Sequence, residues 1–168
     1  MTLVRFPVAV IVQRKPLASR WAAEHWEPLA VETMATEPTG AHPVRIAGDA
    51  SGECWRFGGH MIELHRSEAE GYFLNVTAPE PKVFVMWHAS ESVSAPPIVP
   101  VIVTVSYNEA ARMLDGGDCV DAVPMPPEIR ALVESYVAAH YRPEPKRKVR
   151  RNDPFGDDAR RREDEPTR

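Results

Sequence analysis

Apolar positions follow a short, strand-like period through much of the first 105 residues. Every position from Phe6 to Val12 is apolar, which favours a strand buried on both faces. Leu29–Val31 predicts a second strand. Residues 34–52, rich in Thr, Gly, Pro and Asp, have no readable period and predict a loop.

Between Cys54 and His88 the pattern predicts a meander of short strands. They are expected at 54–57, 60–66, 72–77 and 83–88, with turns at 58–59, 67–71 and 79–81. Short strands separated by turn residues at this regular spacing indicate an antiparallel sheet with barrel-like closure.

The period then becomes helical. Ile98–Val105 predicts a strand in which Pro100 indicates an edge or a bulge. Ser106 and Glu109 have the spacing of a capping box, so a helix is expected from Ser106 to Asp115, ended by residues 116–117, both glycine. The predicted class is therefore α+β, an antiparallel, barrel-like sheet with two C-terminal helices.

The second C-terminal helix has the strongest pattern in the chain. It begins at residues 126–127, both proline, and is expected to end before Pro143. Its apolar stripe consists of Ile129, Leu132, Val133, Tyr136, Val137 and His140.

Charge divides the chain near Tyr141. Residues 142–168 contain 10 basic and 7 acidic residues, whereas residues 1–141 contain 10 basic and 17 acidic ones. The last segment has too few apolar residues to offset the entropy lost on ordering. We expect one folded domain over residues 1–141 and a disordered mixed-charge tail over residues 142–168.

The beginning of the chain lacks a basic segment followed by an apolar run, and the longest apolar stretches are too short to span a bilayer. The sequence therefore predicts a soluble, cytoplasmic protein without membrane contact. Cys54 and Cys119 are expected to be reduced thiols, and the sequence leaves a single bridge open.

Catalytic and metal-binding patterns are weak. His60 and His65 lie five residues apart on a predicted strand, which places them on opposite faces and favours surface histidines over metal ligands. Asp115, Asp118 and Asp121 are spaced too irregularly for a calcium loop, so a solvated loop edge is the favoured role. No catalytic residue, metal site or cofactor is predicted.

Two groups of residues are candidates for binding a partner. Arg14, Arg20, Trp21 and Trp26 form the first, because Trp and Arg are enriched at interaction hot spots. Packing over the core is the more frequent role of such tryptophans. The second group is a basic run in the tail, consisting of Lys146, Arg147, Lys148, Arg150 and Arg151. Interspersed acids and the acidic body disfavour nucleic acid, and leave a protein partner or a solubilising role.

Several segments together resemble an uncharacterised family of small bacterial proteins. The segments that carry this resemblance are Phe6–Val12, Arg14–Leu17, Trp21, Glu24–Glu27, Glu63–Arg66, Glu70–Tyr72, Val123–Glu128 and the basic ending. Genes of this family typically lie in formate dehydrogenase gene regions, beside molybdenum-enzyme subunits and their chaperones. The resemblance implies an accessory role and assigns no catalytic residues.

The sequence and the resemblance together predict a non-enzymatic accessory protein that assists formate dehydrogenase maturation or regulation. Its expected partner is a subunit of that enzyme or its chaperone. The alternative is a small-molecule or cofactor-binding barrel with a sensing role, because a barrel mouth can hold a ligand where side chains do not fill it. An enzyme would require a buried pair of titratable groups with shifted pKa values.

Overall fold

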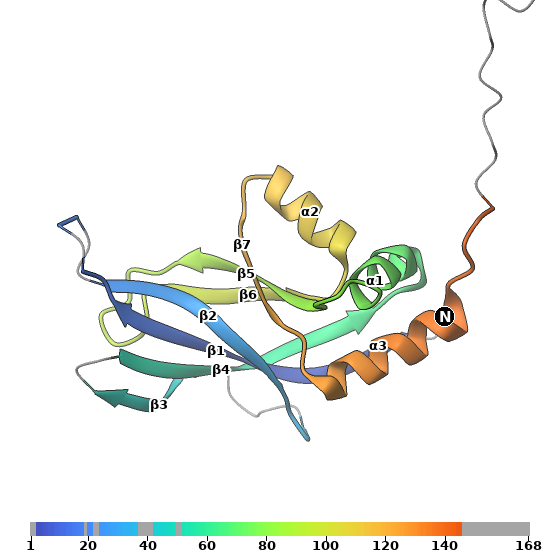
Figure 1. Ribbon diagram of the computed structural model, residues 1–168. Coiled ribbons are helices and arrows are strands. Elements are labelled where there is room, and N and C mark those ends of the chain that lie inside the picture. Colours follow the sequence, from blue (N-terminus) through green and yellow to red (C-terminus); the bar gives the residue numbers. More distant parts are fainter. Residues whose placement is uncertain (1–2, 19, 22–23, 37–41, 50–51, 146–168) are drawn as a thin grey trace, which may run out of the picture.

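The computed structural model describes residues 3–18, 20–21, 24–36, 42–49 and 52–145 (Figure 1). This part of the chain forms strands, three α-helices and a short 3-10 turn at Arg66–Glu68. The elements are β1 (Val4–Pro16), β2 (Glu24–Thr33), β3 (Val44–Asp49), β4 (Gly52–Leu64), α1 (Ala69–Val76), β5 (Lys82–Ala89), β6 (Ile98–Thr104), α2 (Tyr107–Asp115), β7 (Cys119–Pro124) and α3 (Pro127–His140).

The strands form two antiparallel sheets, with the orders β2-β1-β4-β3 and β6-β5-β7. β2 lies against β7 and β4 lies against β6, so the sheets enclose a common core. The α+β class is confirmed. The barrel expectation is wrong for the described strands, because no ladder joins the two sheets into a closed barrel. Pro28 in β2 and Pro100 in β6 have no N–H group to donate to a further strand.

The core is made by one face of each sheet and by the helices. Val8, Val10 and Val12 of β1 are fully buried, and Ala9 and Ile11 on the opposite face are also buried. The prediction of a strand buried on both faces is therefore confirmed. The other core side chains come from both sheets and from α1 and α3: Val31, Phe57, Ile62, Leu64, Tyr72, Val76, Val83, Val85, Ile98, Val103, Val105, Val123, Ile129, Val133 and Tyr136.

The segment predicted as a strand at 72–77 is instead the helix α1. Tyr72, Leu74 and Val76 alternate as in a strand, but Tyr72 and Val76 also have the i, i+4 spacing of a helix face. The core buries Tyr72 and Val76 and leaves Leu74 45% exposed. Packing against α3, rather than local pattern, decides between the two periods.

Three further expectations about strands are corrected. The predicted loop at 34–52 contains β3, and a strand that was not predicted, β7, follows α2. β4 continues through Gly58 and Gly59, where a turn was expected. Gly59 has φ of 80° and lies where the β1–β4 register shifts between Val8 and Val10, so this glycine permits a bulge instead of a turn.

The helix predictions at the C-terminal end are largely confirmed. The Ser106 hydroxyl accepts a hydrogen bond from the Glu109 N–H at 3.1 Å, and Gly117 follows α2 with φ of 88°. The Glu109 carboxylate does not reach back as in a capping box, because it accepts from the Thr104 hydroxyl at 2.5 Å. Pro100 lies in the edge strand β6, opposite a register shift, as predicted.

α3 buries half of its predicted stripe. Ile129, Val133 and Tyr136 are in the core, whereas Leu132 is 43% exposed. α1 and α3 contact each other at one end of the sheets, and β3 lies at the opposite end (Figure 1). None of the helices in the described part of the chain has the length and apolar character needed to cross a bilayer.

Tyr72 and Tyr136 are buried tyrosines with different hydroxyl environments. The Tyr72 hydroxyl accepts from the His65 N–H at 3.0 Å and donates to the Glu63 carbonyl at 3.3 Å. The buried Tyr136 hydroxyl has no hydrogen-bond partner within the described residues. Burial raises the pKa of Tyr72 to about 12 and also raises the pKa of Tyr136, so both phenols remain protonated at neutral pH.

We therefore expect Tyr72→Phe to lower the free energy of unfolding by about 1–2 kcal/mol, because it leaves two backbone groups without partners. Tyr136→Phe should change the free energy of unfolding by less than about 0.5 kcal/mol, or stabilise the protein, because it removes an unpaired hydroxyl. Urea denaturation of both variants measures the difference. Equal losses in the two variants would contradict this account.

Candidate functional site

The candidate site lies at the end of the four-stranded sheet that is opposite α1 and α3 (Figure 1). Arg14, near the end of β1, has Trp26 of β2 and Glu53 of β4 as its paired residues. Paired residues in antiparallel strands project from the same face of the sheet. Arg14, Trp26 and Glu53 therefore continue the face on which Val10 and Val12 enter the core.

The Arg14 guanidinium joins the ends of the strands. Its Nη1 lies 3.6 Å from Glu24 Oε2, its Nη2 lies 3.8 Å from Glu53 Oε2, and Nη2 donates to the Asp49 carbonyl at 3.3 Å. Glu53 also pairs with Arg45 of β3 at 3.4 Å. The Arg14 and Glu53 side chains are only 20% and 19% exposed, so solvent screens this pair less than a surface pair.

The same two carboxylates also hold two tryptophans. Trp26 Nε1 donates to Glu24 Oε1 at 3.2 Å, and Trp55 Nε1 donates to Glu53 Oε1 at 2.8 Å. Both rings are partly buried and pack against the core. The indoles and the guanidinium are therefore fixed relative to one another before any partner arrives.

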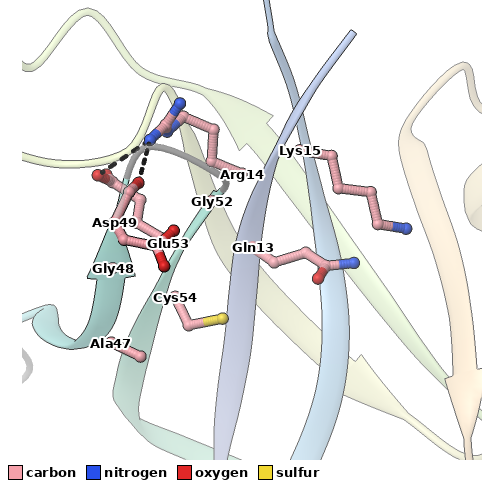
Figure 2. A pocket seen from close by; sticks show the side chains of 9 residues that line it. All are labelled: Gln13, Arg14, Lys15, Ala47, Gly48, Asp49, Gly52, Glu53 and Cys54. Atoms are coloured by element: carbon pink, nitrogen blue, oxygen red, sulfur yellow. Dashed lines mark hydrogen bonds and ion pairs between the residues drawn. The ribbon is translucent and has the colours of Figure 1, made fainter.

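Two clefts open beside this network. The larger has a volume of about 410 Å³ and lies between the sheet end and the β5–β6 loop, where it is lined by Arg14, Glu24, Trp26, Glu53, Trp55 and Ser92–Pro97. The smaller, of about 300 Å³, lies where β1 meets the β3–β4 hairpin. Figure 2 shows Arg14 reaching over the smaller cleft toward Asp49 and Glu53. Arg14 and Glu53 line both clefts.

The opposite face of the same strands carries a second polar cluster. Gln13 Nε2 donates to Glu27 Oε1 at 2.8 Å, Lys15 pairs with the same carboxylate, and His25 Nε2 lies 3.5 Å from Glu27 Oε2. The hydrogen bond from Lys15 is the main reason that the pKa of Glu27 is lowered, against a smaller opposing effect of burial. Glu27 therefore stays ionised and fixes the β1–β2 pairing.

The predicted Trp/Arg group is divided by the structure. Arg14 and Trp26 are brought together as a cross-strand pair. Arg20 and Trp21 lie in the β1–β2 connection, where Arg20 is exposed and Trp21 is 94% exposed. Packing over the core is therefore confirmed for Trp26 and wrong for Trp21, because Trp21 follows the end of β1 and lies beyond the core.

A comparison with protein families matches residues 7–150 to the model described as "Protein of unknown function (DUF3305)". The chain belongs to this family. No curated protein and no solved structure matches the chain. The expectation of an uncharacterised family is confirmed, whereas its bacterial origin and its place in formate dehydrogenase gene regions remain predictions.

The match to the DUF3305 model includes the whole candidate site and all but the last residue of the predicted basic run. Lys146, Arg147, Lys148, Arg150 and Arg151 lie outside the described residues, as does most of the predicted disordered tail. Their predicted binding role remains a prediction.

Four residues of the site in this DUF3305 chain were not predicted: Glu24, Arg45, Glu53 and Trp55. Glu53 and Trp55 are two positions apart, which on a strand places them on one face. That signal was present in the sequence. Their proximity to Arg14 depends on the β1–β4 register, which the local pattern does not specify.

The other candidate residues are dispersed. Cys54 and Cys119 are free thiols, and the described part of the chain has no group of three or more His, Cys, Asp or Glu residues that could hold a metal ion. Asp121, expected at a loop edge, lies in β7 and accepts a hydrogen bond from Trp87 Nε1 at 2.7 Å. The aspartate therefore has a structural role between β5 and β7.

Burial lowers the pKa of the partly buried His60 below its ordinary value. As pH falls, His60 therefore takes up a proton in the unfolded chain before it does so in the folded protein. The stability that this residue contributes above about pH 6.5 is lost as the pH drops toward its folded-state pKa. His60→Gln should show a smaller loss of unfolding free energy between pH 7.5 and pH 5.5 than the unmodified protein. His88→Gln, at an exposed position, is the control, and an identical loss in both variants would contradict the assignment to His60.

Proposed function

We propose that this protein is a non-enzymatic, cytoplasmic accessory protein that binds a formate dehydrogenase subunit or that enzyme's chaperone. The contact surface is the sheet end that carries Arg14, Arg20, Trp21 and Trp26. The observation that carries this proposal is the 94% exposure of Trp21 beside the exposed Arg20. A tryptophan has a large apolar surface, and Trp and Arg are the residue types that most often dominate binding energy.

The geometry of the sheet end next to the β1–β2 connection supports recognition by a pre-formed surface. Arg14 is held by Glu24 and Glu53, and these carboxylates also fix the indoles of Trp26 and Trp55. Side chains that are already ordered lose little conformational entropy on association. A partner that contacts Arg14 and Trp26 therefore meets side chains that are already ordered.

The choice of partner rests on the family resemblance. Genes of the resembling family lie beside formate dehydrogenase subunits and their chaperones, which favours a role in maturation or regulation of that molybdoenzyme. The basic run of the tail would add an electrostatic contact that weakens with salt.

Affinity capture of the tagged full-length protein, from cells that express the dehydrogenase, tests the proposal. We expect a dehydrogenase subunit or chaperone to be recovered, and recovery to fall at least about tenfold for Trp21→Ala, which removes a hot-spot side chain. Tyr107→Ala on α2, which is 56% exposed, is the matched control and should retain the partner. Recovery of neither partner type by the unmodified protein would overturn the proposal.

Deletion of the gene gives an independent test of the physiological role. Dehydrogenase activity and metal content should fall in the deletion strain and be restored by the full chain. A version that ends at Arg142 separates the folded body from the tail, and its failure alone would assign the role to the tail. Normal activity in the deletion strain would contradict a role in maturation.

A small-molecule sensing role is the second candidate, and the two clefts favour it. The ligand would lie at the sheet end between Trp26 and Trp55, because core side chains fill the space between the sheets. Titration of the protein with formate, followed by tryptophan fluorescence, tests this. A saturable change that Trp55→Phe abolishes would support formate sensing, and an unchanged spectrum would contradict it.

A further inference from the structure

Val93 lies in the β5–β6 loop, residues 90–97, and has the most exposed large apolar side chain among the described residues. It is 104% exposed and Trp21 is 94% exposed, whereas no other such side chain in the described part of the chain exceeds 56%. Single exposed apolar residues are ordinary on a protein surface, but several of them at one place mark an interaction site. The significance of Val93 therefore depends on where its loop lies relative to Trp21.

Val93 and Trp21 belong to segments on opposite sides of the larger cleft. Residues 92–97 line this cleft on the loop side, and Glu24 and Trp26 line it on the sheet side. Trp21 precedes Glu24 by three residues, so their Cα atoms are at most roughly 11 Å apart. In Figure 1 the β5–β6 loop lies at the same end of the molecule as the end of β1 and the start of β2. The two most exposed apolar side chains of the described chain therefore flank one cleft.

The β5–β6 loop is closed at its base and fixed by a buried proline. The Ser90 N–H donates to the Pro97 carbonyl at 2.6 Å. Pro96 is buried, and the Ser92 N–H donates to Ser90 Oγ at 3.3 Å. Val93 therefore extends from a short, internally bonded loop, so little additional chain must become ordered when a partner covers it.

The polar groups on the sheet side of the cleft already have partners within the protein. The Trp26 and Trp55 N–H groups donate to Glu24 and Glu53, and Arg14 lies near both carboxylates. An apolar group that covers the two indoles therefore leaves both N–H groups paired, which avoids the cost of a buried unpaired donor. A small anion would instead meet two carboxylates around a single guanidinium. The cleft accordingly favours an uncharged group of a partner.

We propose that the β5–β6 loop is the second half of the partner-binding surface, with Val93 and Trp21 as apolar anchors on the two sides of the cleft. This inference rests on the proposed function and adds the kind of contact. The dehydrogenase subunit or chaperone presents one apolar recess for each anchor and, between them, an uncharged segment that covers Trp26 and Trp55. Such an arrangement matches the way in which hot-spot side chains insert into desolvated pockets of a partner.

Affinity capture with the tagged full chain tests the proposal. We expect Val93→Glu to lower recovery of the dehydrogenase subunit or chaperone at least about tenfold, because a carboxylate would enter an apolar recess without a partner. Leu74→Glu on α1, at a position 45% exposed at the opposite end of the molecule, is the matched control and should retain the partner. Both positions are exposed, so both variants should keep the urea midpoint of the unmodified protein, which separates loss of contact from loss of folding.

The capture experiment distinguishes this inference from the proposed function. Undiminished recovery with Val93→Glu would overturn the role of the β5–β6 loop and leave the proposed function standing. Recovery of neither partner type by the unmodified protein would overturn both.

Site-directed photo-cross-linking tests the position of Val93 directly. In a background with Cys54→Ser and Cys119→Ser, Val93→Cys and Leu74→Cys each provide a single thiol for a benzophenone maleimide. We expect a covalent adduct with the dehydrogenase subunit or chaperone from position 93 and none from position 74. Equal yields from both positions, or no adduct from either, would contradict the placement of this loop in the partner-binding surface.

Discussion

Replacing Asn75 with alanine is expected to lower the free energy of unfolding by about 3–5 kcal/mol. Asn75 is 2% exposed in α1. Its Nδ2 donates to the Lys82 carbonyl at 2.7 Å and to the Val105 carbonyl at 2.8 Å, and its Oδ1 accepts from the Lys82 N–H at 2.9 Å. One side chain thus joins α1 to the start of β5 and the end of β6.

The magnitude follows from what the substitution leaves behind. Two carbonyls and one N–H would lose a partner in a largely buried place, and each such loss costs about 1–3 kcal/mol before relaxation. Asn75→Asp should be at least as damaging, because its carboxylate faces two carbonyl oxygens.

Urea denaturation measures the Asn75 effect. Arg130→Ala is a suitable control, because Arg130 forms an exposed i, i+4 pair with Glu134 at 2.7 Å, and loss of such a pair costs less than about 0.5 kcal/mol. A loss below about 1 kcal/mol for Asn75→Ala would mean that water replaces the amide group at this site.

Gly71→Ala is expected to lower the free energy of unfolding by about 2–4 kcal/mol, although alanine has the higher helix propensity. A Cβ at Gly71 in α1 would lie 2.3 Å from Ser106 Oγ, 3.2 Å from the Asn108 backbone N and 3.3 Å from Ser106 Cβ. Helix propensity favours alanine by only about 1 kcal/mol, so the steric overlap decides the sign.

Ser106 cannot readily move away from this overlap. It is fully buried, and its hydroxyl donates to Glu68 Oε2 at 2.7 Å while it accepts from the Glu109 N–H. Glu68 is held in turn by Arg112 at 2.6 Å. An alanine at position 71 therefore either breaks this network or forces α1 and α2 apart.

A double-mutant cycle separates steric overlap from other effects of the alanine. Ser106→Ala alone should cost about 1–2 kcal/mol through loss of the helix cap. Combined with Gly71→Ala, it removes the atom that clashes. The loss of unfolding free energy in the double variant should therefore be smaller than the sum of the two single losses by at least about 1 kcal/mol. Simple additivity, measured by thermal and urea denaturation, would contradict the steric explanation.

Both predictions depend on contacts between segments far apart in the chain, and this explains which features of the fold could be predicted. β1 was predictable because seven consecutive apolar residues fit a strand buried on both faces. α3 was predictable because proline begins it and Ile129, Val133 and Tyr136 recur on one face. In α1, Tyr72 and Val76 fit both the period of 2 of a strand and the period of 3.6 of a helix, and contact with α3 selected the helix.

The candidate site was predictable only in part. Local composition placed Arg14, Trp21 and Trp26 in one group, and the β1–β2 hairpin brings Arg14 and Trp26 together because they are close in the sequence. Glu53 and Trp55 join them from a strand about forty residues later. That register is set by the bulge at Gly59 and by burial of Phe57 and Ile62, which act across the whole sheet.

The sequence by itself determined the α+β class, the buried first strand, the two C-terminal helices and the difference in charge between the body and the segment after Tyr141. Each of these depends on residues that are neighbours along the chain, where side-chain period and charge act directly. Tertiary structure decided the separation into two sheets, the helical form of α1, the exposure of Trp21 and the network around Arg14. These depend on which strands meet, because hydrogen-bond registers and shared burial connect residues that no local pattern relates.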